Sequence, residues 1–399
     1  MEYYKQSLAL HKQLKGKIET GNKVDIKTKE DLSLLYSPGV AQPCREIAAN
    51  PSTVYDYTIK GNTIAIVSDG SAILGLGNLG ALAAIPVMEG KAMLFKKYGG
   101  VNAFPICLDT QDTEEIIETV RRMAPVFGGI NLEDISAPRC FEIEERLQDL
   151  GIPVFHDDQH GTAIVVLAGL INAAKVVGKN LFDLKVVVNG AGAAGVAISK
   201  MLKGIGIKDA DGMAVKEVIV CDTKGIIHGD RRDLNKPKIE LLNYTNNNNI
   251  KGTLQDALVD ADVFIGVSGP GSLHQDDVKL MAKDAIIFAC ANPTPEIDPG
   301  EAFEGGAAIV GTGRSDLPNQ VNNVLVFPGL FRGALLSRAT TITPGMKLAA
   351  AHAIADCIEE PTRDRIIPCT LDMTVADKVA EAVAKAWKEH LQEEIAVAI

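Results

Sequence analysis

Two pairs of adjacent carboxylates are the side chains best suited to bind a metal ion. Glu133-Asp134 and Asp157-Asp158 each follow a short apolar run, where a strand is expected to end. In α/β proteins, functional groups gather at the carboxyl ends of the strands. Carboxylate oxygens, completed by water and substrate oxygens, suit octahedral Mg²⁺ or Mn²⁺. A second interpretation stays open, because acidic residues also cap the first turns of helices.

The segment HDDQH places His156 and His160 four residues apart, which is the histidine spacing of the zinc-peptidase motif HExxH. The glutamate of that motif is replaced by Asp157, and Gly161 is expected to interrupt the helical turn. The sequence therefore favours structural roles for both histidines over a zinc site.

A glycine-rich segment matches the dinucleotide-binding pattern GxGxxG, directly follows an apolar run at 185–189 and opens a helical run. It consists of Gly190, Ala191, Gly192, Ala193, Ala194 and Gly195. A strand, a tight turn and a helix N-terminus in this order present N–H groups to a pyrophosphate. The next apolar run, beyond a polar insert at 208–216, ends at Asp222, which is expected to bind the adenosine ribose. An ordinary strand–helix turn is the alternative interpretation.

A second match to the same pattern lies at 75–80, but DGSAI separates it from the preceding apolar run. The pattern alone is weak evidence for a nucleotide site. We interpret this segment as close backbone packing or as a wall of the substrate site.

Apolar runs alternating with helical patterns predict the elements that position these groups. Strand-like runs occur at 185–189, 217–222, 262–268, 285–291 and 307–311. Such runs indicate a parallel sheet covered on both faces. We predict an α/β fold with an N-terminal catalytic domain at 1–150, a doubly wound Rossmann-type dinucleotide-binding domain at 151–343 and a helical C-terminal tail at 344–399.

The composition excludes several classes of partner. The chain has 399 residues and a net charge of −11, so its field repels nucleic acid and anionic membranes. The apolar stretch at 72–88 is broken by Asn78 and Pro86, and the first residues lack a run of the signal-peptide kind. Seven cysteines without a CxxC pair favour reduced thiols. We expect a cytoplasmic protein that acts on a small molecule.

Taken together, these segments resemble the malic enzymes of the short bacterial type, and the resemblance covers nearly the whole chain. It rests on LLYSPGVAQPC, IVSDGSAILGLGNLG, IPVMEGKAMLFKKYGG, GGINLEDISAP, PVFHDDQHGTA, VVNGAGAAG, ANPTPEI and GTGRSDLPNQVNNVLVFPGLFRGAL. The resemblance implies oxidative decarboxylation of L-malate, through oxaloacetate, to pyruvate and CO₂. It also implies NAD or NADP, a divalent cation (Mg²⁺ or Mn²⁺) and a homodimer.

The resemblance also implies roles for individual residues. Tyr36 of YSPG corresponds to the general acid of the family, Lys91 of EGKA to its general base, and Asp157 to an acid near that lysine. A buried lysine acts as a base only if its pKa is lowered. Without the resemblance, Lys91 would be interpreted as a solvated helix lysine, and Tyr36 as a partly buried core tyrosine.

Three carboxylates and two amides complete the implied site. The metal ligands are Glu133, Asp134 and Asp158, and the substrate is contacted by Lys91, Asn292 and Asn323. One departure concerns Ala72, which stands where eukaryotic members carry an arginine that binds a malate carboxylate.

Cofactor choice and the exact reaction stay open at this stage. Asp222 would repel the 2′-phosphate of NADP, so we expect NAD, but Lys224, Arg231 and Arg232 are close enough in sequence to bind that phosphate. An oxaloacetate decarboxylase or a malolactic-type enzyme is an alternative on the same scaffold. A dinucleotide-binding regulatory module is an alternative of a different class, which a lysine base and a metal site argue against.

Overall fold

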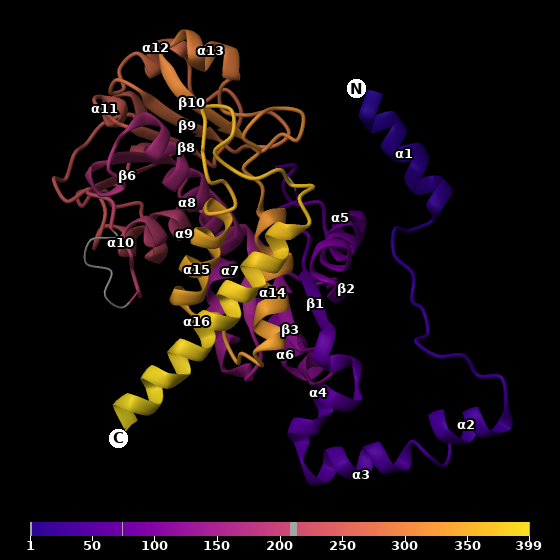
Figure 1. Cartoon of the computed structure of the whole chain (residues 1–399). Helices are drawn as coiled ribbons and strands as arrows, with labels where there is room; N and C mark the ends of the chain where they lie inside the picture. Colours follow the sequence, from indigo (N-terminus) through magenta and orange to yellow (C-terminus); the bar gives the residue numbers. More distant parts are fainter. Residues whose placement is uncertain (1, 74, 208–213, 399) are drawn as a thin grey trace.

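The computed structural model describes residues 2–73, 75–207 and 214–398. Most of the polar insert predicted at 208–216 therefore lies outside the described residues. The body of the protein is built on two β-sheets (Figure 1). The first sheet has the order β2-β1-β3-β4 and the second the order β10-β9-β8-β5-β6-β7. Their pairings are parallel, apart from that of the two-residue β7 with β6. The predicted α/β fold is confirmed.

The first sheet is short and largely buried. Its strands are β1 (Thr63–Ser68), β2 (Asn102–Cys107), β3 (Gly129–Leu132) and β4 (Val154–His156). The helices that connect them are α5 (Ala81–Leu94), α6 (Thr113–Met123) and α7 (Arg139–Arg146). Because β4 pairs with β3, this sheet extends beyond residue 150, where we placed the end of the first domain.

The second sheet follows the predicted apolar runs closely. Its strands are β5 (Lys185–Asn189), β6 (Glu217–Asp222), β7 (Gly225–Ile226), β8 (Val263–Gly266), β9 (Ala285–Ala289) and β10 (Ala307–Thr312). Its helices are α9 (Ala193–Leu202), α10 (Lys236–Leu241), α11 (Leu254–Leu258), α12 (Gln275–Val278) and α13 (Pro299–Glu304). β5 pairs with β6 on one side and β8 on the other. The strand order reverses there, and ligands of such sheets bind at that point.

The long helix α8 (Asp157–Val177) joins the two sheets and packs against α9 and α15 (Pro344–Ala355). It is long and apolar enough to cross a membrane, but 67% of its most apolar window is buried inside the protein, as in a core helix. Contrary to the sequence analysis, Gly161 does not interrupt it. The C-terminal tail is helical, as predicted, with α16 (Thr374–Ala398) packed on α15 and on α14 (Phe327–Leu336).

The N-terminal arm, residues 2–59, projects from this body (Figure 1). It contains α1 (Glu2–Leu14), α2 (Lys29–Leu35), α3 (Ala41–Ala49) and α4 (Val54–Tyr57). No residue from 3 to 59 is buried, and the first buried side chain of the chain's described part is that of Lys60. The arm therefore has no hydrophobic core of its own.

Candidate active site

The two acid pairs lie side by side at the carboxyl edge of the first sheet. Glu133 directly follows β3 and Asp157 directly follows β4, and these strands are neighbours. Asp134 adopts a left-handed backbone conformation (φ 53°), and its N–H donates to Oδ2 of Asp158 at 2.8 Å. Ligand oxygens of Glu133, Asp134 and Asp158 lie within 4.8 Å of one another. Asp157 and Asp158 also occupy the first turn of α8, so their position fits the capping interpretation, whereas Glu133 and Asp134 lie in the loop between β3 and α7 and do not cap a helix.

This carboxylate cluster (Glu133, Asp134 and Asp158) has the charge and chemistry that a divalent cation requires. Burial raises the pKa of Glu133 and of Asp158, while the charge of Lys91 opposes that rise. Crowded, buried carboxylates repel one another, and either a proton or a cation must offset that repulsion. The donor set consists of hard oxygens, which fits Mg²⁺ or Mn²⁺.

Lys91 of α5 is buried and points at the cluster rather than at solvent. Its Nζ contacts Oδ2 of Asp157 and lies 2.5 Å from Oε2 of Glu133. It also lies 4.3 Å from the centre of the Phe327 ring. Asn323 donates to the same Oδ2 of Asp157 at 2.5 Å. The interpretation of Lys91 as a solvated lysine is therefore wrong. The structure brings four predicted site residues into contact, namely Lys91, Glu133, Asp157 and Asn323.

The electrostatics of Lys91 differ from what a base needs. Burial acts to lower its pKa, but the charges of Asp157, Glu133 and Asp158 outweigh burial, so the pKa is raised. Burial in turn raises the pKa of Asp157 to about 7, against the influence of Lys91. Without a cation on the cluster, the lysine ammonium is the charge that neutralises these acids.

The carboxylate of Glu144, on α7, fixes the first turn of α8 through polar contacts. Its carboxylate accepts from the His156 N–H (3.0 Å) and from Gln159 Nε2 (3.1 Å), and it lies 2.9 Å from His160 Nε2. Burial acts to raise the pKa of Glu144, but His160, Lys347 and His156 together outweigh burial and lower the pKa to about 2. His160 thus has a structural partner, as the sequence favoured, and the ring of His156 is fully buried with its Nε2 3.8 Å from Oδ2 of Asp158.

Sequence analysis missed Glu144, although α7 contained a signal. Cys140, Ile143 and Leu147 are buried with a spacing typical of a helical core face, and Glu144 lies within that stripe. A carboxylate in an apolar stripe needs buried hydrogen-bond donors. Those donors come from α8, which no local pattern in α7 reveals.

Gly161 is required by the site. A Cβ at this position would collide with Oδ1 of Asp157 and come within 3.2 Å of Cβ of Asn323. The glycine therefore makes room for the contact between Asp157 and Asn323, one helical turn after Asp157.

The structure does not bring Tyr36 to this site. Tyr36 ends α2 in the N-terminal arm, and its side chain is 68% exposed. Figure 1 shows α2 well apart from α5, which carries Lys91. The interpretation of Tyr36 as a partly buried core tyrosine is wrong, and its role as an acid stays a prediction.

The glycine segment at 75–80 packs against the loop that carries Asn292. A Cβ at Gly75 would lie 2.5 Å from the Asn292 carbonyl oxygen. The N–H of Ala72 donates to the Asp134 carbonyl at 3.0 Å, so the position of the missing arginine borders the carboxylate cluster. Next to it, Arg139 donates to Oγ of Ser71 at 2.9 Å. These contacts support the interpretation as close packing beside the substrate site.

The second glycine segment has the geometry of a pyrophosphate-binding turn. A Cβ at Gly190 would lie 2.5 Å from the Val267 carbonyl oxygen, and a Cβ at Gly195 would collide with the Gly190 carbonyl. Gly192, the N-cap of α9, has no atom within 4 Å of its Cβ position. Its backbone therefore faces open space at the helix N-terminus, as an anion site requires.

Asp222 ends β6 next to this turn, but cations surround its carboxylate. Arg231 donates to Oδ1 at 2.8 Å and to Oδ2 at 3.0 Å, and Lys238 donates to Oδ2 at 2.6 Å. Burial acts to raise the pKa of Asp222, but these hydrogen bonds lower it to about 2. Lys224 and Arg231 both pair with Asp233, whereas Arg232 is exposed. The charge that would repel a 2′-phosphate is therefore largely compensated.

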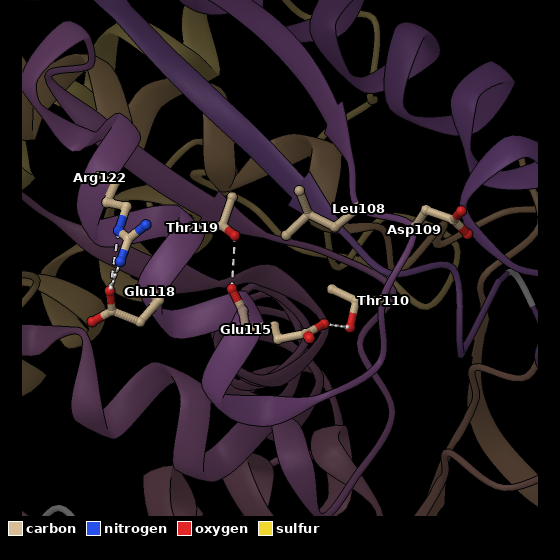
Figure 2. A pocket seen from close by; sticks show the side chains of 7 residues that line it. All are labelled: Leu108, Asp109, Thr110, Glu115, Glu118, Thr119 and Arg122. Atoms are coloured by element: carbon tan, nitrogen blue, oxygen red, sulfur yellow. Dashed lines mark hydrogen bonds and ion pairs between the residues drawn. The ribbon is translucent and has the colours of Figure 1, made fainter.

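A hollow of about 450 Å³ lies past the end of β2 (Figure 2), and none of the three carboxylates of the cluster lines it. It is lined by Leu108, Asp109, Thr110, Glu115, Glu118, Thr119 and Arg122. Thr110 donates to Glu115 at 2.5 Å, and Arg122 pairs with Glu118 at 3.0 Å. We assign this hollow no role in the chemistry.

Comparison with known proteins finds a matching family model for each half of the chain. Family models match residues 15–148 ("Malic enzyme, N-terminal domain") and 159–388 ("Malic enzyme, NAD binding domain"). The chain is 56% identical to the bifunctional malic/malolactic enzyme of Bacillus subtilis, over 98% of this chain and 94% of that protein. It is 57% identical to the NAD-dependent malic enzyme of Geobacillus stearothermophilus, over 93% of this chain and 76% of that protein. The crystal structure of an NAD-dependent malic enzyme from Thermotoga maritima matches with a TM-score of 0.89 and 50% identity, over 94% of this chain and 98% of that one.

We predict that Gly161→Ala lowers turnover by roughly 10²-fold, because a displacement of about 1 Å in a catalytic group has that effect. In an unconstrained helix the same change stabilises by about 1 kcal/mol. Initial rates and thermal unfolding measure the two effects. Gly169→Ala, in the same helix but against Phe288, is the control and should keep its activity. Parental turnover in Gly161→Ala would contradict the role of this glycine.

Proposed function

The chain belongs to the malic enzyme family, and we propose that it converts L-malate and NAD⁺ to pyruvate, CO₂ and NADH with Mg²⁺ or Mn²⁺. The observation that carries the proposal is the buried ammonium of Lys91 between Asp157 and Glu133, beside three clustered carboxylates. A protein that only senses a dinucleotide needs neither a buried base nor a metal site. The regulatory-module alternative is therefore disfavoured.

Lys91 is the proposed base of the oxidation. Its neutral amine accepts the proton of the malate C2 hydroxyl, while the C2 hydride passes to the nicotinamide and oxaloacetate forms. Glu133, Asp134 and Asp158 would hold the cation, which supplies Lewis acidity toward the substrate oxygens and offsets their charge. With the charges of Glu133 and Asp158 offset, burial is opposed chiefly by Asp157, so the pKa of Lys91 falls from its raised value.

Asp157 and Asn323 position this base. The Asp157 carboxylate holds Nζ of Lys91 and accepts a hydrogen bond from Asn323. Both partners are buried or partly buried, so the lysine keeps one orientation before and after it takes the proton. Loss of CO₂ from oxaloacetate then leaves an enolate whose C3 needs a proton, and we propose Tyr36 as its donor.

The dinucleotide is proposed to bind across the turn 190–195, with its pyrophosphate at the N-terminus of α9. The open space at Gly192 and the reversal of strand order between β5 and β8 support this placement. NAD is the proposed preference, because the carboxylate of Asp222 at the end of β6 can accept hydrogen bonds from the ribose hydroxyls and would repel a 2′-phosphate. The compensation of its charge by Arg231 and Lys238 supports some use of NADP as well.

A malolactic reaction is the second candidate, since the Bacillus subtilis relative is named a bifunctional malic/malolactic enzyme. In that reaction the hydride returns to pyruvate, so lactate accumulates and NADH does not. Measuring both products with malate separates the two functions.

Location and domain limits are also proposals. All seven cysteines are unpaired, which supports a reducing, cytoplasmic compartment. We propose the domains 1–150, 151–343 and 344–399, with β4 at the start of the second range completing the first sheet.

Removal of the cation is predicted to abolish activity. EDTA should stop turnover, and Mn²⁺ or Mg²⁺ should restore it, because the cluster offers hard oxygen ligands. Asp158→Asn should lose Mn²⁺ binding in calorimetric titration but still bind NAD. Asp109→Asn, an exposed acid outside the cluster, is the control. Unchanged Mn²⁺ binding in Asp158→Asn would refute the ligand assignment.

Asp222→Ala is predicted to erode the preference for NAD by at least about tenfold, equivalent to about 1.4 kcal/mol. The substitution removes ribose hydrogen bonds and frees Arg231 and Lys238 for a phosphate. The measurement is kcat/KM with each cofactor. If the parent enzyme already favours NADP by that factor, the interpretation of Asp222 is wrong.

Loss of the base and loss of the acid should differ kinetically. Lys91→Ala should lower malate oxidation by roughly 10²-fold or more, with partial rescue by a small amine. Tyr36→Phe keeps the ring but loses the proton donor, so hydride transfer should survive better than release of pyruvate. Stopped-flow NADH formation and pyruvate release follow the two steps. Near-parental rates in Lys91→Ala would exclude a catalytic role for this lysine.

A further inference from the structure

We infer that Glu296 is a positioning residue, whose carboxylate fixes the loop that carries Asn292 to the loop beside the dinucleotide turn and so aligns malate with the nicotinamide. This inference rests on the proposed function, in which the dinucleotide binds at 190–195 and malate is contacted by Asn292. It goes beyond that function by assigning the alignment of the two ligands to a residue that acts through both loops.

The carboxylate of Glu296 is fully buried and is held by backbone N–H groups. Oε1 accepts from the Ser268 N–H at 3.1 Å, and Oε2 accepts from the Ala291 N–H at 3.0 Å. In the part of the chain that the structure describes, no lysine or arginine forms an ion pair with it. Burial raises the pKa of Glu296, and these hydrogen bonds oppose that rise. A buried carboxylate is costly unless hydrogen bonds compensate it, and here both oxygens are used for that purpose.

The two N–H groups belong to different loops at the carboxyl edge of the second sheet. Ser268 lies in the loop that follows β8, whereas Ala291 lies in the loop that follows β9, directly before Asn292. A further contact joins the same loops, because the Leu273 N–H donates to the Glu296 carbonyl at 3.2 Å. Glu296 therefore ties the two loops together through its side chain and through its backbone.

The loop after β8 is also tied to the strand that leads into the dinucleotide turn. Asn189, the last residue of β5, donates to Oγ of Ser268 at 3.1 Å and to Oγ of Ser272 at 3.0 Å. This loop thus contacts β5 on one side and the loop of Asn292 on the other. The side chain of Glu296 is the link on the side of Asn292.

Glycines leave the space in which these groups fit closely. A Cβ at Gly266, the last residue of β8, would lie 2.4 Å from Cδ of Glu296. Asn292 is enclosed as well, since a Cβ at Gly313 would lie 2.5 Å from its Nδ2 and a Cβ at Gly75 would lie 2.5 Å from its carbonyl oxygen. A shift of the loop at its base would therefore displace the amide of Asn292.

The test is Glu296→Gln, which keeps the shape of the side chain but replaces one acceptor oxygen by an NH₂ group. One of the two loops then loses its hydrogen bond. We expect kcat/KM for malate to fall by roughly 10²-fold, as for a displacement of about 1 Å in a positioned group. The primary isotope effect with malate deuterated at C2 should rise, because misaligned hydride transfer limits the rate more. NAD affinity in a binding titration should stay parental, because the contacts of Asn189 remain.

Asp277→Asn is the matched control. This buried carboxylate also accepts from a backbone N–H of the loop after β8, that of His274 at 3.0 Å, but its second hydrogen bond comes from Gln255 of α11. It should keep the parental kcat/KM and the parental isotope effect. Gly266→Ala is a second variant, which displaces the Glu296 carboxylate without changing the charge. It should reproduce the pattern of Glu296→Gln, and the double variant should be no worse than the worse single variant, because both changes act on one contact.

The inference is overturned if Glu296→Gln matches Asp277→Asn in its malate kinetics. It is also overturned if Glu296→Gln loses NAD affinity while its isotope effect stays parental, since the residue would then only support the dinucleotide site. Absence of malate-dependent NADH formation in the parent enzyme would instead contradict the proposed function, and this inference with it.

Discussion

A single buried ammonium group faces four carboxylates, and the rest of the site depends on this imbalance. Glu133, Asp134, Asp157 and Asp158 gather at one sheet edge, and Lys91 contacts two of them. Burial makes each negative charge expensive, which is why the pKa values of Glu133 and Asp157 are raised. A divalent cation on the cluster would relieve the repulsion and free Lys91 from its role as a counter-ion. In the proposed mechanism, metal binding and activation of Lys91 as a base are therefore coupled.

The surrounding fold holds these charges together against their repulsion. Neighbouring strands β3 and β4 deliver the two acid pairs, and the left-handed backbone of Asp134 links them. Glu144 ties the first turn of α8 to α7, so that the turn carrying Asp157 cannot move away. The missing Cβ of Gly161 leaves the space in which Asp157 meets its partners. Each feature restricts the position of one carboxylate.

The sequence alone predicts those elements whose pattern lies within one contiguous segment. The run EVIVCD predicts β6 to the residue, because a strand buried on both faces is apolar throughout. The turn at 190–195 is predictable for the same reason, since its strand, glycines and helix are contiguous. The acid pairs were found because they follow strands, whereas their mutual distance depends on which strands pair.

Features set by distant contacts escaped prediction. The pKa of Lys91 was expected to be lowered, but it depends on acids that lie 42 and 66 residues away in the chain. The turn chemistry of Gly161 suggested a helix break, whereas contact with Asp157 explains the glycine within an unbroken helix. Tyr36 was expected near Lys91, and no pattern in YSPG reveals that α2 lies on a projecting arm. Tertiary structure decides all three.

The position of bound Mn²⁺ tests the electrostatic coupling most directly. Crystals grown with Mn²⁺ and measured near its absorption edge would show the ion as an anomalous difference peak. We expect one peak per chain, coordinated by Glu133, Asp134 and Asp158, with Lys91 still in contact with Asp157. A peak at His156 and His160, or in the hollow lined by Asp109 and Glu115, together with an empty carboxylate cluster, would contradict the coupling of metal and base.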